Sequence, residues 1–227
     1  MLECIALSRH YGRKAVISDL NLTLDTGKIH VLLGENGSGK TTFLKMAAGL
    51  LRPSHGQILF QGHPLSWRDR AKISWLSTEP IFYDYMRVSD VEQYYADFFP
   101  DFDRKRFSGL MQKLGFEDNP KAKDLSSGSG AKLRIAAALS RRAELYLLDE
   151  PMGSIDYKSR EEIISLILET ADETNTFVIS THLLDEIESF TDRALFLMEG
   201  RLICDVNPEE ERENTGRSIV ELYQEIM

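Results

Sequence analysis

Hydrophobic positions follow two different periods along the chain. Over the first 30 residues apolar and polar side chains alternate, with apolar positions at Cys4 and Ala6 and later at Leu20, Leu22 and Leu24. A period of two is typical of β-strands that bury one face. The N-terminal part is therefore predicted to be β-structure.

Short apolar runs then alternate with helical patterns. Because a buried parallel strand is apolar on both faces, such runs predict strands, and the longer stretches between them predict helices. The predicted strands cover residues 30–34, 58–60, 73–76, 145–148 and 177–180, and the predicted helices cover 41–51, 132–142 and 159–174. This βα alternation predicts an α/β fold with a mostly parallel sheet and right-handed crossovers.

Two further helical regions stand apart from this alternation. Apolar residues recur at helical spacing from about 88 to 123, with a break at Phe99-Pro100-Asp101, which predicts a helical insertion between two sheet-forming halves. Near the end of the chain Ile219, Leu222, Tyr223 and Ile226 form one helical stripe. That stripe predicts a short terminal helix docked on its own domain.

Composition narrows the class of protein. The 227 residues are 42% hydrophobic and 28% charged, with a net charge of −9, which disfavours a nucleic-acid partner. Cys4 and Cys204 lack metal-ligand spacing and lie in apolar stretches, so buried reduced thiols are expected. No signal peptide and no membrane-spanning run of apolar residues is recognised.

A glycine-rich loop carries the clearest chemical signal. Gly34 and Gly39-Lys40-Thr41 have the spacing of a phosphate-binding loop, with a predicted strand before it and a helix after it. Glycines let successive N–H groups point inward at phosphate oxygens, and the helix start adds its positive dipole end. Lys40 is expected to contact the β- and γ-phosphates and the Thr41 hydroxyl to ligate Mg²⁺. The expected nucleotide contacts are Gly34, Glu35, Asn36, Gly37, Ser38, Gly39, Lys40, Thr41 and Thr42.

Two carboxylates follow the apolar run at 145–148. Asp149 and Glu150 are expected at the exposed end of that strand. Hard Mg²⁺ prefers one or two carboxylates together with phosphate oxygens, so Asp149 is the candidate metal ligand. Glu150 is then placed to orient or deprotonate an attacking water. Together the two motifs predict hydrolysis of a nucleotide.

Further motifs resemble a known family. Leu125-Ser126-Ser127-Gly128-Ser129 resembles the signature loop of ATP-binding cassette (ABC) ATPases, the nucleotide-binding subunits of transporters. Tyr11 stands where that family stacks an aromatic side chain on adenine, Ser154-Ile155-Asp156 resembles its D-loop, and Ser180-Thr181-His182 resembles its switch-histidine motif. The resemblance extends over the whole chain.

The resemblance implies a fold, a reaction and partners. It implies a P-loop NTPase (RecA-like) core with a mostly parallel sheet, an N-terminal antiparallel β subdomain and a helical insertion at about 88–124, all within one nucleotide-binding domain, 1–227. It implies ATP with Mg²⁺, hydrolysed with Glu150, His182 and Lys40 as catalytic residues. In the family Ser126, Gly128 and Asp156 serve a site shared with a second subunit, so a homodimer or heterodimer is expected.

The same resemblance implies a role in transport and a location at the membrane. The expected role is to power transport, with export favoured, through a separate integral membrane permease, from the cytoplasmic, inner face of the membrane. Two alternatives stay open: a soluble ABC ATPase that is not a transporter, and a regulatory cassette with weak hydrolysis. Soluble ABC ATPases typically carry two cassettes with a basic linker or a long coiled-coil insertion, and this sequence has neither.

Several positions depart from the family pattern or have a simpler explanation. Thr78 stands where the family's Q-loop glutamine helps to ligate Mg²⁺, and its shorter hydroxyl is expected to reach the metal through water. In the signature loop Ser127 replaces the family's first glycine and Ser129 replaces its glutamine, so a weaker or altered contact is expected. The aromatic stretch 82–87 is either a socket for the membrane subunit or a packed loop. Three residues have a simpler alternative to their family role. Tyr11 is then a plain surface aromatic, Asp156 only caps the helix that follows it, and His182 is an ordinary core or surface histidine.

Overall fold

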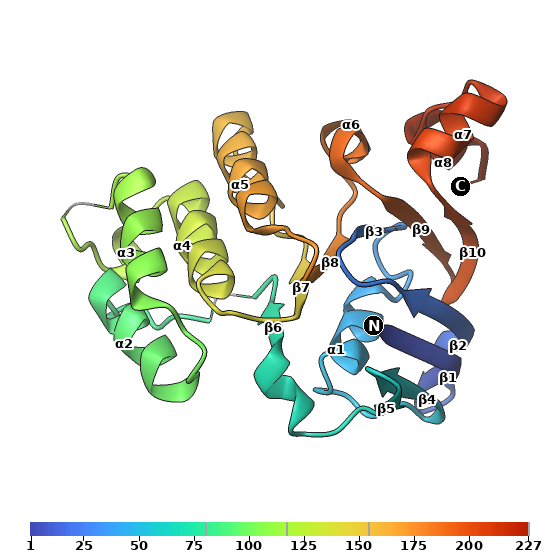
Figure 1. Cartoon of the computed structure of the whole chain (residues 1–227), viewed down its shortest axis with the longest axis horizontal. Coiled ribbons are helices and arrows are strands. Elements are labelled where there is room, and N and C mark those ends of the chain that lie inside the picture. The colour runs from blue at the N-terminus through green and yellow to red at the C-terminus, as the bar shows by residue number, and fades with distance from the viewer. Residues whose placement is uncertain (80, 117, 154, 227) are drawn as a thin grey trace.

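Two sheets and their helices make up the molecule (Figure 1). The structure is a computed structural model and describes residues 1–79, 81–116, 118–153 and 155–226, with only the backbone at 185 and 186. The larger sheet has six strands in the order β10-β9-β3-β8-β7-β6, and the smaller has four in the order β2-β1-β4-β5. The α/β prediction, with a P-loop NTPase core, is confirmed.

The six-stranded sheet is parallel except at one edge. Strands β3 (Ile29–Leu33), β6 (Ile73–Leu76), β7 (Leu145–Asp149), β8 (Thr176–Ser180) and β9 (Arg193–Met198) run parallel, and only β10 (Arg201–Val206) pairs antiparallel, with β9. Strand β6 forms the edge at the other side. Because neighbouring strands are parallel, the loops that follow β3, β7 and β8 all leave from the carboxyl-terminal end of the strands, which is called the loop edge of the sheet below.

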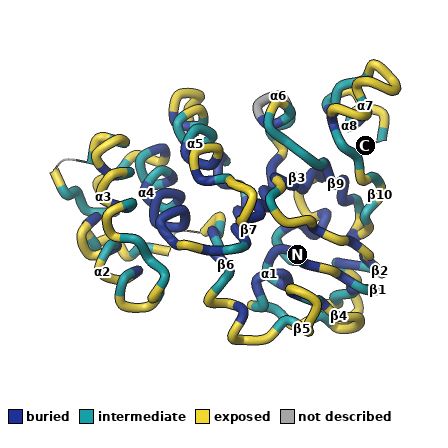
Figure 2. Tube along the Cα trace, in the orientation of Figure 1, coloured by how far each residue is buried: buried dark blue, intermediate teal, exposed yellow. Residues whose placement is uncertain are grey.

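Each face of this sheet has its own hydrophobic core (Figure 2). On one face Val31, Tyr146 and Phe177 pack against helices α4 (Ser127–Leu139) and α5 (Tyr157–Thr170). On the other face Leu32 and Leu147 meet α1 (Lys40–Ala47) and the small sheet. Burial on both faces explains why these strands are continuous apolar runs.

The small sheet is antiparallel, as the resemblance implied. It consists of β1 (Leu2–Tyr11), β2 (Lys14–Leu24), β4 (His55–Phe60) and the two-residue β5 (His63–Pro64). Cys4 lies in its buried face, and burial raises the pKa of its thiol to about 12, so this thiol is inert. Cys204 on β10 is only half-buried, so the expectation of two buried thiols was wrong for that residue.

The helical insertion has a core separate from the sheet. Helices α2 (Val88–Phe98) and α3 (Arg104–Lys113) pack on α4 through an aromatic cluster that includes Tyr95, Phe102 and Phe107. The break between them falls at residues 99–103, as the Phe99-Pro100-Asp101 sequence predicted. The extent of this region as a subdomain, about 88–124 within a single domain 1–227, stays a prediction.

The helix boundaries differ from those predicted, most of all at three helix ends. Helix α1 ends at Ala47 rather than 51, because Gly49 takes the left-handed conformation at φ +67° and ends it. Helix α4 begins at Ser127 rather than 132, because the Ser126 side chain accepts a hydrogen bond from the Ser129 N–H and caps the first turn. Helix α5 ends at Thr170 rather than 174, since Ala171 is extended and a turn follows at residues 173–174.

Sequence reasoning missed the elements between 193 and 215. Strands β9 and β10 form a hairpin whose turn has Glu199 at φ +47° and Gly200 at φ +78°, and α7 (Pro208–Thr215) follows, capped by Asn207. The apolar run 194–198 before Glu199-Gly200 was the available signal for the hairpin. The predicted terminal helix is present as α8 (Ile219–Ile226), packed on the core through Ile219 and Leu222.

Arg141 joins the insertion to the sheet. Its buried guanidinium donates through Nε to both Asp101 carboxylate oxygens at 3.1 Å, and through Nη1 and Nη2 to the carbonyls of Ile73 and Ala71 at 2.6 Å. It also lies over the Phe99 ring, 4.2 Å from its centre. A buried ion pair that loses one partner leaves the other charge uncompensated.

Arg141→Met is therefore expected to lower the free energy of unfolding by about 3 kcal/mol. The neighbouring ion pair of Arg142 with Asp103 is exposed on the arginine side, so Arg142→Met is the matched control, with a much smaller expected loss of stability. Urea unfolding followed by circular dichroism measures both. Equal losses in the two variants would contradict the assigned role of Arg141.

His30 makes stability depend on pH. Its ring is fully buried on β3, and this burial lowers its pKa, against the opposing effect of the hydrogen bond between Nε2 and the Asp25 carbonyl. Because the folded chain favours neutral His30, its contribution is complete above the unfolded pKa of about 6.5 and is lost as the pH falls below that value.

We expect His30→Asn to flatten the fall in stability between about pH 7 and pH 5 relative to the parent chain. His55 is exposed on β4, so His55→Asn should leave the slope unchanged. Urea midpoints measured at several pH values give the three slopes. Parallel curves for the parent and the His30 variant would rule out this contribution.

Candidate nucleotide site

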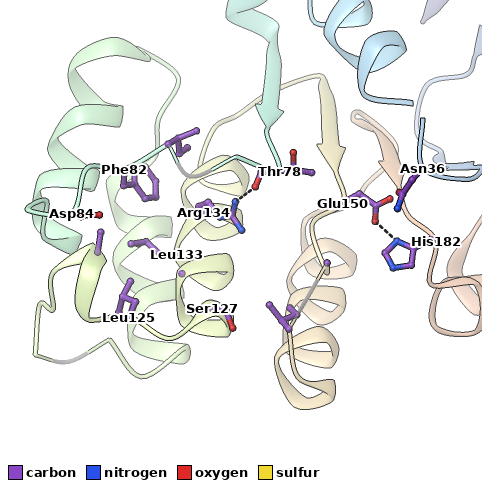
Figure 3. A pocket seen from close by; sticks show the side chains of 15 residues that line it. Asn36, Thr78, Phe82, Asp84, Leu125, Ser127, Leu133, Arg134, Glu150 and His182 are labelled. Carbon is purple, nitrogen blue, oxygen red and sulfur yellow. Dashed lines mark hydrogen bonds and ion pairs between the residues drawn. The ribbon is translucent and has the colours of Figure 1, made fainter. Parts of the chain in front are cut away.

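Three loops at one edge of the six-stranded sheet carry the predicted chemistry. The phosphate loop follows β3. Asp149 is the last residue of β7 and Glu150 comes directly after it, and His182 follows β8. The register pairs Asp149 with Ser180 across β7 and β8, which brings residues from distant parts of the sequence together. Figure 3 shows Asn36, Glu150 and His182 side by side at this edge.

The phosphate loop has the backbone that only glycine adopts easily. Gly34, Gly37 and Gly39 have φ values of +154°, +86° and +111°. A methyl group at Gly39 would approach the Ile17 side chain at 2.7 Å and the Val16 carbonyl at 2.8 Å. Glu35, Asn36 and Gly37 are exposed, and Ser38 to Lys40 are buried. The loop is therefore packed firmly against β2 where it enters helix α1.

Lys40 is held inside the loop. Its Nζ donates to the carbonyls of Gly34 at 2.7 Å and Glu35 at 3.1 Å, and the ammonium lies 3.8 Å from Glu150 Oε1. Buried charges need compensation, and here carbonyl dipoles and a carboxylate provide it. Lys40 thus faces the hollow of the loop next to the predicted catalytic carboxylate.

Asp149 is buried, contrary to the expectation of an exposed strand end. It is 1% exposed, and each carboxylate oxygen accepts a hydroxyl: Thr41 Oγ1 donates to Oδ2 at 2.8 Å and Ser180 Oγ to Oδ1 at 2.7 Å. Burial is tolerated because a charged acceptor with two donors is well satisfied. Two of the three predicted metal-binding residues, Thr41 and Asp149, are therefore neighbours. Thr42 is the next residue of α1 and is half-buried.

Glu150 is fixed by its backbone. It has φ +46°, rare for a residue with a side chain, and its N–H donates to Ser180 O at 3.1 Å and Ser180 Oγ at 3.0 Å. Its Oε2 lies 3.0 Å from His182 Nδ1. Within the described part of the chain, Oε1 is buried without a hydrogen-bond partner. Strain of this kind collects at functional sites. Sequence reasoning did not single out Ser180 as a site residue, although its motif contains it.

The signature and D-loop residues lie away from the phosphate loop, at the N-terminal ends of α4 and α5. Asp156 caps α5, with its carboxylate accepting from the Ser159 N–H at 3.0 Å and the Ser159 hydroxyl at 2.7 Å, and these bonds lower its pKa. The capping alternative for Asp156 is therefore confirmed, and its interface role stays a prediction. A methyl group at Gly128 would meet Ser159 Oγ at 2.6 Å and Asp156 Oδ2 at 2.9 Å. Ser154 lies outside the described residues.

Tyr11 and Thr78 are both exposed. Tyr11, 49% exposed at the end of β1, has the Arg9 guanidinium 4.7 Å from the centre of its ring. Thr78 lines a cavity of about 540 Å³ together with Asn36, Glu150 and His182, and the apolar side of the same cavity includes Phe82 and Leu133 (Figure 3). Thr78 is thus close to the hydrolytic residues without a described contact to Asp149.

Comparison with known proteins decides the family. The family model described as ABC transporter matches residues 17–153. This chain belongs to the ABC transporter family. It is 30% identical over 207 residues to the lantibiotic transport ATP-binding protein SrtF of Streptococcus pyogenes, covering 90% of each chain. It is 31% identical over 205 residues to the ABC transporter ATP-binding protein YtrB of Bacillus subtilis (strain 168), covering 89% of this chain and 70% of that protein.

Solved structures agree. A structure of an ATP-binding subunit of an ABC transporter superposes with a TM-score of 0.88 at 25% identity, over 100% of this chain and 99% of that one. The predicted family is confirmed, and this ABC chain is an ATP-binding, ATP-hydrolysing transporter subunit. Among the described residues no helix is both long enough and apolar enough to cross a membrane.

The phosphate loop gives a direct test of this site. Gly39→Ala introduces both backbone strain and an overlap with Val16, so ATP affinity should fall at least about tenfold, or 1.4 kcal/mol. Gly216→Ala is the control, because it carries strain at φ +75° with no heavy atom within 4 Å of the added carbon. Titration with a fluorescent ATP analogue measures both. An unchanged affinity in Gly39→Ala would mean that this loop does not hold the nucleotide.

Proposed function

We propose that this subunit powers export through a separate integral membrane permease, by closing around ATP with a second nucleotide-binding subunit and opening after hydrolysis. One observation carries this proposal: Lys40, Glu150 and His182 converge at the loop edge, with Glu150 Oε2 3.0 Å from His182 Nδ1 and Oε1 3.8 Å from Lys40 Nζ. A carboxylate between two groups that address a γ-phosphate is placed to activate water.

Nucleotide binding rests on the loop and the residues around it. The N–H groups from Gly34 to Thr42 and the start of α1 receive the phosphates, with Lys40 on the β- and γ-phosphates. Tyr11 is proposed to stack on adenine through its exposed ring. The orphaned Ser38 hydroxyl, buried without a partner among the described residues, is a further group suited to this ligand.

The residues present fit Mg²⁺. Thr41 and Asp149 offer a hydroxyl and a carboxylate 2.8 Å apart, which are the hard oxygen donors that this ion prefers. When bound, Mg²⁺ neutralises charge that develops on the phosphates. Thr78, at the mouth of the same cavity, is proposed to contribute through water. Ser180 holds the second Asp149 oxygen and so fixes the direction of the first.

Glu150 is the proposed general base. Among the described residues its buried Oε1 accepts no hydrogen bond and lies 3.8 Å from the Lys40 ammonium, so it is proposed to accept a proton from water, while His182 orients the other oxygen and donates toward the γ-phosphate. The left-handed backbone at φ +46° and the two bonds of the N–H to Ser180 fix the direction in which the side chain leaves the main chain, and His182 and Lys40 contact its carboxylate. General-base catalysis of this kind contributes about 10²–10⁴ in rate.

The partner subunits are inferred from surfaces. Ser126, Gly128 and Asp156 lie where α4 and α5 begin, and they are proposed to complete the nucleotide site of the second subunit, in a homodimer or heterodimer.

Tyr83 and Tyr85 are 68% and 69% exposed, and their rings stack with centres 5.5 Å apart. Exposed aromatics suit an interface, so this surface is proposed to receive the permease at the inner, cytoplasmic face of the membrane. No nucleic-acid partner is expected.

Thr78 supports the alternative of a regulatory cassette. A short exposed hydroxyl in place of the family's glutamine is a weaker metal contact, which supports a regulatory cassette with slow turnover as a second candidate. The presence of Glu150 and His182 in contact favours the motor.

Glu150→Gln separates the two candidates. The amide cannot take a proton, so ATP hydrolysis should fall by about 10²–10⁴ while ATP binding persists, and a dimer should accumulate with ATP and Mg²⁺. Phosphate release and size-exclusion chromatography measure these outcomes. Glu144→Gln, at the opposite end of β7 and paired with Lys72, is the control and should match the parent rate.

Equal and negligible turnover in the parent and Glu150→Gln, with the membrane subunit present, would leave the regulatory role. A mutant that stays monomeric with ATP and Mg²⁺ would contradict the shared-site dimer.

A further inference from the structure

Arg134 holds the loop that carries Thr78. Arg134 lies two turns into α4, and its Nη1 donates to the Thr78 carbonyl at 2.9 Å, with the carbonyls of Ser77 and Glu79 at 3.4 and 3.5 Å (Figure 3). Three successive carbonyls therefore converge on one guanidinium nitrogen. The loop leaves β6, which is the edge strand of the sheet as described, and Arg134 supplies a side-chain contact to it from α4.

The guanidinium is unusual in its surroundings. It lines the 540 Å³ cavity, and burial lowers its pKa from the ordinary arginine value. An arginine side chain nevertheless stays charged in a protein. Across the described ranges no carboxylate forms an ion pair with Arg134. Carbonyl dipoles of this one loop are its hydrogen-bond partners, so the position of the loop and that of the charge stabilise each other.

The loop lies beside the proposed base. Parallel pairing of β6 with β7 matches Leu76 with Leu148, so the chains emerge together and Thr78 and Glu150 reach the same cavity. Threonine has a short side chain with one hydroxyl. Where that hydroxyl lies is therefore decided by the backbone, and the backbone is what Arg134 holds.

The same helix reaches the signature loop. Helix α4 begins at the Ser126 cap, and farther along it the Ala138 carbonyl accepts from Ser74 Oγ of β6 at 2.9 Å. Arg134 thus adds a second bond between α4 and the β6 segment, on the side of the cavity. Through these two bonds α4 is connected both to β6 and to the loop that follows it.

We propose that Arg134 is a positioning residue for ATP hydrolysis, which ties residues 77–79 to α4 so that Thr78 stays beside Glu150. The inference rests on the proposed function of Glu150 as base. Arg134 acts through the main chain of the loop, and no contact between it and the phosphate loop is described. It should therefore affect turnover and leave ATP binding nearly unchanged.

Steady-state kinetics of Arg134→Ala test this role. We expect kcat to fall about tenfold, equivalent to 1.36 kcal/mol in the barrier, with KM for ATP within about twofold of the parent. Arg134→Lys keeps a charged donor that can reach one carbonyl, so it should recover part of the rate. Arg104→Ala is the control, because Arg104 pairs with Glu92 on the insertion surface and should leave both constants unchanged.

Trp75 supplies an independent readout. It lies on β6 three residues before Thr78, and the chain has only two tryptophans. Trp67 is 72% exposed, so Trp67→Phe leaves Trp75 as the single reporter. In that background ATP and Mg²⁺ should change the Trp75 emission, and Arg134→Ala should reduce that change by at least half, whereas Arg104→Ala should not.

The outcomes separate this inference from the proposed function. If kcat and the Trp75 response in Arg134→Ala equal those of the parent, or if kcat, KM and the thermal midpoint all change together, the positioning role is overturned while Glu150 stays the base. If the parent chain with its membrane subunit does not hydrolyse ATP, the proposed function fails, and the Trp75 response still decides whether Arg134 positions the loop.

Discussion

The burial of one carboxylate organises the nucleotide site. Asp149 is 1% exposed and is stabilised by hydroxyls from Thr41 on α1 and Ser180 on β8. A buried charge is costly unless its acceptors are filled, so these three segments are held in register at the end of the sheet. Glu150 follows directly with φ +46°, and its N–H donates to the carbonyl and the hydroxyl of Ser180. The orientation of the proposed base thus depends on the hydrogen bonds of its neighbour.

Much of this arrangement could be predicted from the sequence, because it depends on local patterns. The apolar runs 145–148 and 177–180 identify buried strands, and Gly34 to Thr41 combines loop, charge and helix start within eight residues. The exposure of Asp149 was predicted wrongly, since its partners Thr41 and Ser180 are 108 and 31 residues away. Strand pairing decides such contacts, and no local pattern reports it.

The missed elements have the same cause. Strand β9 pairs with β3, and its side chains are buried alternately in the cores on the two faces of the sheet, whereas its apolar run 194–198 alone is compatible with a strand or a helix. Likewise, residues 127–130 resemble a flexible serine-glycine loop, yet they form the first turn of α4, capped by Ser126 and packed on α5. Arg134 gave no signal in the sequence, because its partners are main-chain carbonyls, which every residue carries.

The close packing at Gly128 has a mechanical consequence. Since no side chain separates this residue from the cap of α5 formed by Asp156 and Ser159, the starts of the two helices are in direct contact. These two helix starts carry the residues proposed to meet a second subunit, so a side chain added at position 128 would push them apart and change the shape of that surface.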